Sequence, residues 1–157
     1  MKQPPELTKA ENAMKSGVIT KDGFLGTDNR HLIDILTEDD AEVARLGLTH
    51  WIIAARMRYF RDEGLKGEGL SVEIEGKFEV MAESAKGKLA CPFGEPGMIT
   101  KNNISVTNKE TGRTIYFSDL DIHLIGRHGF YQGKGSPYRV SPKELKEVLE
   151  IESTDQQ

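Results

Sequence analysis

The stretch LSVEIEGKFEVMA, residues 70–82, decides the fold class because apolar and polar residues alternate along it. Apolar side chains fall on one face of an extended chain at residues 70–74 and again at 78–82. Glu75 and Gly76 separate the two runs and supply turn-forming residues. The stretch therefore predicts a β-hairpin.

A second hairpin is predicted downstream, where apolar residues alternate at 104–106 and at 115–117 on either side of the turn-forming segment 108–112. Residues before position 65 follow the helical period, and two further helical segments follow the hairpins. Helices, then hairpins, then helices predict an α+β fold with N-terminal helices, antiparallel β-hairpins in one sheet and two C-terminal helices.

Three N-terminal helices are expected. Asp28 is a candidate cap for the first, and Thr37, followed by Asp40, is a candidate cap for a short second helix that ends near Gly47. Thr49 begins the third, which runs to about Glu63. Apolar residues cover more than one stripe of this third helix: Trp51, Ile52, Ile53, Ala55, Met57, Tyr59 and Phe60. We expect it to be a central helix under the sheet or the interface of a homodimer.

Local capping patterns define the C-terminal helices. Ser118 and Asp121 open a helix that runs to about Arg127, after which Gly129 can end it. The last helix has a complete start signal, in which Ser141 is the cap, Pro142 the first helical residue and Glu144 the partner in a capping box.

The chain is long enough to bury a core without a disulfide or a metal, since it has 157 residues of which 37% are hydrophobic. We expect a flexible N-terminal arm at residues 1–17, a single α+β domain at 18–151 and a flexible tail at 152–157. No internal repeat or linker divides the domain.

The formal charge of −4 gives no general attraction for nucleic acid, so a nucleic-acid partner is not expected. The single cysteine, Cys91, cannot form an intramolecular disulfide. The N-terminal residues lack the apolar core of a signal peptide, and no apolar run reaches membrane-spanning length. These features predict a cytoplasmic protein with no membrane partner.

The main candidate site lies in IHLIGRHGFYQGKGSPYR, residues 122–139, which contains no acidic residue. Glycines let backbone amides converge on an anion, and Lys or Arg supplies charge. The stretch predicts a site for a small anionic or phosphate-bearing ligand, formed by Arg127, Gly133, Lys134, Gly135, Ser136 and Arg139. The glycine spacing does not match known phosphate loops, and an ordinary connecting loop explains the same residues.

A second hypothesis is a transition-metal site, with zinc as the candidate cofactor, because Cys91, His123 and His128 offer suitable ligand types. On an ideal helix the two histidines lie about 140° apart, so they face one ion only if the helix ends early. Such a site would suit a metal-binding protein or a metal-dependent hydrolase. A cysteine nucleophile with a histidine base oriented by Asp121 is the further alternative, and whether the protein is an enzyme stays open.

A third hypothesis is an interaction module, or a helix-turn-helix DNA-binding unit formed by two helices around Gly47. Arg56, Arg58 and Arg61 lie on the second helix of that pair, but Glu38, Asp39, Asp40 and Glu42 make the first helix acidic. Acidic residues repel phosphates, and the second helix begins with apolar side chains. The arginines are better explained as ion-pair partners on a solvated face.

Overall fold

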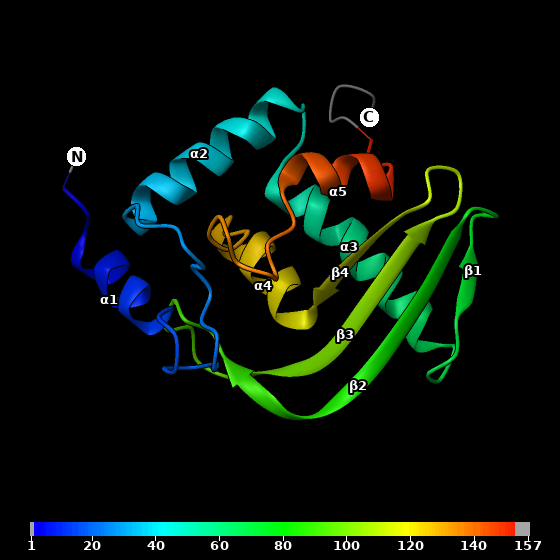
Figure 1. Ribbon diagram of the computed structural model, residues 1–157, viewed down its shortest axis with the longest axis horizontal. Helices are drawn as coiled ribbons and strands as arrows, with labels where there is room; N and C mark the ends of the chain where they lie inside the picture. The colour runs from blue at the N-terminus through cyan, green and yellow to red at the C-terminus, as the bar shows by residue number, and fades with distance from the viewer. Residues whose placement is uncertain (1, 153–157) are drawn as a thin grey trace.

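The computed structural model describes residues 2–152 and confirms the α+β class (Figure 1). Its helices are α1 (Pro5–Ala13), α2 (Leu32–Arg45), α3 (His50–Leu65), α4 (Asp119–His128) and α5 (Pro142–Leu149). Its strands are β1 (Val72–Ile74), β2 (Phe78–Ala90), β3 (Met98–Asn108) and β4 (Arg113–Ser118). Of the predicted tail, residues 153–157 lie outside the described part of the chain.

The four strands form one antiparallel meander in the order β1-β2-β3-β4. The hairpins predicted from the alternating segments are joined, because β2 and β3 pair from Phe78–Asn108 to Ala90–Met98. The register shifts once, between Ala85 and Lys88. Residues 83–88 of β2 are exposed and show no apolar alternation, which explains why this extension was not predicted. In Figure 1 the long β2–β3 hairpin curves beneath α4.

Helix α3 is the central helix of the larger hydrophobic core. Ile53, Met57 and Phe60 are fully or almost fully buried, and they belong to one cluster with Phe78 and Val80 of β2. The helix also packs against α4 and α5. Trp51 lies on its outer side and is 69% exposed. The homodimer predicted for this helix stays a prediction.

The N-terminal residues differ from the loosely held arm expected at positions 1–17. They contain α1, whose Ala10 and Met14 lie one helical turn apart and are both buried. These side chains belong to a second hydrophobic cluster that also contains Phe24, Cys91 and Leu124. The Phe24 amide donates to the Met14 carbonyl at 2.8 Å, which fixes the chain after α1. Two buried apolar residues one turn apart thus help to dock this short helix.

Helix α2 is continuous, so the prediction of two helices capped by Asp28 and Thr37 was wrong. Thr37 lies inside the helix and is not an N-cap, because its hydroxyl donates to the Ile33 carbonyl of the preceding turn. The free amides at the start of α2 donate instead to Glu11 and Gln3 of the N-terminal segment, at 2.7 and 2.8 Å. A cap supplied by a distant segment leaves no local pattern in the sequence.

The C-terminal helices begin at the predicted caps, but the capping box predicted at Ser141 is only half formed, because the Glu144 carboxylate accepts from the Ser141 hydroxyl and not from its amide. Ser118 and Asp121 form a complete capping box on α4, and Ser141 accepts a hydrogen bond from the Glu144 amide at the start of α5. Gly129 ends α4 with a φ of 64°. Within residues 2–152, none of the helices is both long and apolar enough to cross a membrane.

Candidate functional site

Cys91, His123 and His128 converge, although they are far apart in the sequence. Cys91 directly follows β2, and both histidines lie on α4. One potential ligand atom from each residue lies within 4.8 Å of the other two. Cys91 is buried and the histidine side chains are partly buried, 22% and 16% exposed. The cluster therefore has the composition and the closeness of a metal site.

Both histidines lie within α4, because the helix continues through His128. Gly129 turns the chain into the left-handed region immediately after it. The ring centroids of His123 and His128 are 5.5 Å apart. The two rings therefore approach each other from within one helix, without the early helix end that was predicted to be necessary.

Glu95 is a fourth group in the cluster, and the sequence interpretation missed it. Its carboxylate lies 3.0 Å from Nε2 of His128 and 3.6 Å from Nε2 of His123. A tight turn brings it back toward Cys91, since the Gly94 amide donates to the Cys91 carbonyl and Gly94 has a φ of 85°. One sequence feature could have indicated Glu95. A metal knuckle would carry its second thiol at about position 94, and a carboxylate follows at the next position.

The contacts of His128 do not match a nucleophilic triad. Cys91 Sγ lies 3.5 Å from Nε2 of His128, and Glu95 approaches the same nitrogen. In a triad the acidic residue binds the other ring nitrogen and orients the imidazole. Asp121, the residue predicted to orient the base, is bonded instead to Ser118 and Gln132. These contacts bring Cys91, Glu95 and His128 close together around one ring nitrogen.

Burial sets the protonation of these groups. It raises the pKa of the Cys91 thiol, which disfavours the thiolate form in the absence of a metal. Burial also lowers the pKa of His128, against the opposing effect of Glu95, and so favours the neutral imidazole that binds metals. Phe93 stacks on the His128 ring at 4.1 Å between centroids and holds its plane.

His123 carries an unsatisfied polar atom. Its Nε2 is buried and has no hydrogen-bond partner among residues 2–152. The Glu95 carboxylate, at 3.6 Å, lies beyond hydrogen-bond reach. An unsatisfied buried polar atom costs about 1–3 kcal/mol. This nitrogen therefore lacks a partner at the point where the other three groups converge.

The basic residues of the predicted anion site are paired with carboxylates of the chain itself. Lys134 Nζ lies 2.9 Å from Glu38, and Arg127 Nε lies 3.3 Å from Glu95. Arg139 forms a two-bond ion pair with Asp39, at 2.9 and 3.0 Å, and also donates to the Gln132 carbonyl. The Arg139 pair is nearly buried, with exposed fractions of 14% and 5%.

The glycines and the serine of the same loop serve close packing. The Gly133 amide donates to the Phe24 carbonyl, and a Cβ at Gly133 would lie 2.2 Å from the Leu25 carbonyl oxygen. A Cβ at Gly135 would lie 2.1 Å from the Thr27 hydroxyl, and the Ser136 hydroxyl donates to Gln132. These contacts dock the loop on residues 24–28 and favour a connecting role over ligand binding.

Two of the three arginines considered for DNA binding have ion-pair partners. Arg56 pairs with Glu75, and its guanidinium lies 4.6 Å from the centre of the Phe60 ring. Arg61 pairs with Asp62 and with the buried Asp119. The buried side chains of α3 belong to the main hydrophobic core. These contacts agree with the interpretation of the arginines as ion-pair partners.

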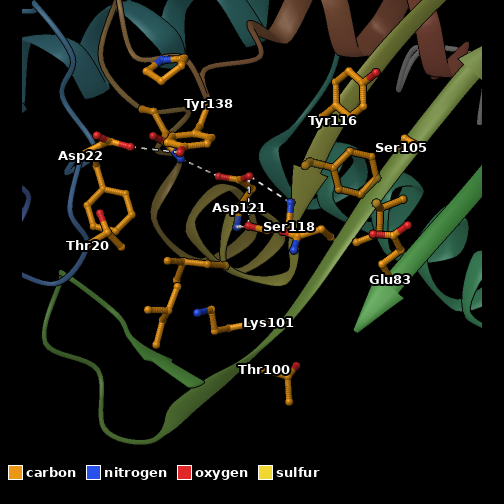
Figure 2. Close-up of a pocket in the computed structure, with 18 of the residues that line it drawn as sticks. Thr20, Asp22, Glu83, Thr100, Lys101, Ser105, Tyr116, Ser118, Asp121 and Tyr138 are labelled. Carbon is orange, nitrogen blue, oxygen red and sulfur yellow. Dashed lines mark hydrogen bonds between the residues drawn. The ribbon is translucent and has the colours of Figure 1, made fainter. Parts of the chain in front are cut away.

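A separate cavity of about 640 Å³ lies in front of the first turn of α4 (Figure 2). Its walls come from residues 20–24, from β2, β3 and β4, and from Gln132, Pro137 and Tyr138. Figure 2 shows Asp22 and Tyr138 on one side, Tyr116 and Glu83 on the other, and Asp121 between them. No sequence motif indicated this cavity, because its lining is spread over six segments of the chain.

Comparisons with known proteins add no functional assignment. No protein family matches the chain, no curated protein is similar to it, and no solved structure shares its fold at a significant level.

Proposed function

We propose that the protein binds a transition-metal ion, with Zn²⁺ as the preferred ion, through Cys91, His123 and His128. The observation that carries the proposal is the convergence of one ligand atom from each of these residues to within 4.8 Å of one another. A thiolate with two imidazoles is a ligand set that selects zinc and similar ions over magnesium or calcium. The buried, unpartnered Nε2 of His123 supports the same assignment.

The distances agree with tetrahedral coordination. With Zn–S near 2.3 Å and Zn–N near 2.0–2.1 Å, the ligand atoms of a tetrahedral site lie roughly 3.4–3.6 Å apart. Cys91 Sγ and His128 Nε2 are separated by 3.5 Å. The two carboxylate oxygens of Glu95 lie 3.0 Å from Nε2 of His128 and 3.6 Å from Nε2 of His123, and we propose this carboxylate as the fourth ligand. Small side-chain movements would complete the geometry.

Four protein ligands leave no open coordination position, so the proposed role is structural and not hydrolytic. The ion would fasten the β2–β3 connection, which carries Cys91 and Glu95, to the end of α4. Arg127 donates to Glu95 from outside the ligand group and would hold its carboxylate in place. A hydrolase would need Glu95 to leave the metal and a water molecule to replace it.

Metal content is the direct test. Protein purified without an affinity tag, and then dialysed, is expected to contain one equivalent of zinc by elemental analysis. Cobalt(II) added to chelator-treated protein is expected to give the visible absorption of a tetrahedral ion and a thiolate charge-transfer band. The proposal would be refuted if the protein bound neither zinc nor cobalt in a stoichiometric amount.

Single-residue variants locate the site. Cys91→Ser, His123→Ala and His128→Ala are each expected to lower zinc affinity by at least roughly ten-fold, since each removes a ligand. His31→Ala is the matched control, because His31 is an exposed histidine at the start of α2 with a side chain 72% exposed. Equal zinc affinity in the control and in the three variants would place the metal elsewhere.

Glu95→Gln separates the structural role from a hydrolytic one. If Glu95 is a ligand, the variant binds zinc more weakly and its cobalt spectrum changes. An unchanged spectrum would show that water or another group occupies the fourth position, and a hydrolytic site would then become the better proposal.

The predicted anion site in the loop at residues 129–139 stays a prediction. Its basic side chains already have carboxylate partners, so an anion would have to displace Glu38 or Asp39. For this reason we place the function at the Cys91 cluster.

A further inference from the structure

The cavity of Figure 2 is a second candidate site, independent of the metal cluster. Its volume of about 640 Å³ falls within the usual range for small-molecule sites, roughly 300–1,000 Å³. Phe24, Leu89 and Leu120 supply buried or partly buried apolar surface from three different elements. Tyr116 and Tyr138 add aromatic rings that are 70% and 53% exposed. The cavity can therefore accommodate an apolar or aromatic body.

The sheet supplies the polar part of the lining through strand residues that face away from the main core. Met81, Ser105 and Tyr116 are direct cross-strand neighbours, and so are Glu83 and Asn103. Lys101 lies two positions before Asn103 on β3 and therefore on the same face. In Figure 2 its side chain extends from the strand toward the space below Asp121.

The acidic groups of the cavity are mostly occupied. Asp22 accepts a hydrogen bond from the Tyr138 hydroxyl at 3.2 Å. Asp121 accepts bonds from Ser118 and from Gln132. Glu83 lies on the exposed part of the sheet. The carboxylates thus offer little to a ligand in the interior of the cavity.

Lys101 differs from these acids. Its side chain is partly buried, and no hydrogen bond or ion pair joins its ammonium group to another residue in the range 2–152. A bound anion would supply this ammonium group with a charge-assisted hydrogen bond that residues 2–152 do not provide. Lys101 is therefore the group of the lining that we consider for anion binding.

We propose that this cavity binds a small amphipathic organic anion, whose apolar body lies among the aromatic and aliphatic walls and whose acidic group contacts Lys101. The recognition combines burial of apolar surface with one charge-assisted hydrogen bond. Carboxylates and sulfonates that carry an aromatic or alkyl body satisfy both requirements.

Two probes test the proposal on the full chain, namely the fluorescent sulfonate 8-anilinonaphthalene-1-sulfonate and decanoate. The sulfonate is expected to bind saturably with one equivalent per chain, and decanoate is expected to displace it. The uncharged dye Nile red is the comparison. An absence of saturable sulfonate binding, or a failure of decanoate to displace it, would overturn the proposal.

Lys101→Met is expected to weaken sulfonate binding at least about ten-fold, because it removes the charge and keeps much of the side-chain volume. Lys101→Arg should recover most of the affinity, and Nile red should bind both variants as it binds the parent protein. Lys88→Met is the matched control, since Lys88 is an exposed residue of β2 outside the lining. Unfolding curves check that each variant folds.

Two results would contradict the assignment of Lys101. Equal sulfonate affinity in Lys101→Met and in the parent protein would mean that no anion is held there. The proposal would also be overturned if Glu83→Gln bound the probes more weakly while Lys101→Met bound them as the parent protein does. The polar contact with the ligand would then come from the Glu83 carboxylate and not from Lys101.

Discussion

The nearly buried ion pair between Arg139 and Asp39 gives the sharpest test of the role assigned to the glycine-rich loop. Replacing Arg139 by Met keeps an apolar side chain of comparable length and leaves the Asp39 carboxylate, 5% exposed, without its partner. Breaking a buried pair in this way costs about 3–5 kcal/mol. For a chain of this size, roughly 2–4 °C is lost for each kcal/mol, so the melting temperature should fall by about 6–20 °C.

Lys134→Met is the control for this experiment because the ion pair that it removes is exposed. Lys134 and Glu38 are 57% and 49% exposed, and such a pair contributes about 0–1 kcal/mol. The double variant Asp39→Leu with Arg139→Met removes both charges, so it should recover a large part of the stability lost in the single variant. Urea unfolding followed by circular dichroism measures all three differences.

The reasoning fails if Arg139→Met costs no more than Lys134→Met. Arg139 would then be available to a ligand, and phosphate should stabilise the parent protein but not the variant. A large loss for Arg139→Met, with no effect of phosphate on either protein, supports the connecting role of the loop.

Three further predictions concern stability and assembly. The Arg30 guanidinium holds the pKa of Asp28 well below its usual value, so ionised Asp28 stabilises the folded protein. This contribution to the free energy of unfolding is fully present above about pH 3.9, where Asp28 is ionised in the unfolded chain too, and it decreases as the pH falls further. Urea unfolding of the parent protein and Asp28→Asn across pH 2–6 should show a difference that is constant above about pH 4 and shrinks as the pH falls toward 2. Gly133→Ala forces a Cβ against the Leu25 carbonyl and should cost about 1–3 kcal/mol in a thermal melt, and an unchanged melting temperature would contradict the observed loop packing. If the predicted homodimer forms through α3, sedimentation should give twice the mass of one chain for the parent protein and the mass of one chain for Trp51→Glu. A parent protein with the mass of one chain would refute this prediction.

Elements that begin with their own local signal could be predicted from the sequence. The capping patterns at Ser118 and Ser141 located α4 and α5, and the alternating segments located the cores of both hairpins. Interactions between distant segments could not be predicted. The start of α2 is bonded to Glu11 and Gln3, and nothing near α2 indicates these partners.

The candidate sites follow the same division. The metal hypothesis identified Cys91, His123 and His128 by ligand type, but their convergence depends on the long β2–β3 hairpin, which brings Cys91 to α4. The positive charge of the loop at residues 129–139 was evident in the sequence. The carboxylates that compensate this charge lie on α2, about 100 positions earlier in the chain. The local excess of positive charge therefore suggested an anionic ligand, whereas the fold supplies carboxylates of the chain itself.

The metal cluster and the cavity share structural elements, and this has a physical consequence. The first turn of α4 contributes Leu120 to the cavity, and its last residue, His128, belongs to the metal cluster. On β2, Leu89 lines the cavity two residues before Cys91. Leu89 and Leu120 both pack in the hydrophobic cluster that includes Cys91. An ion that fixes Cys91 to the end of α4 would therefore also fix the separation of two cavity walls. Because coupling between two sites is reciprocal, an amphipathic anion in the cavity would change metal affinity by the same factor by which the metal changes anion affinity.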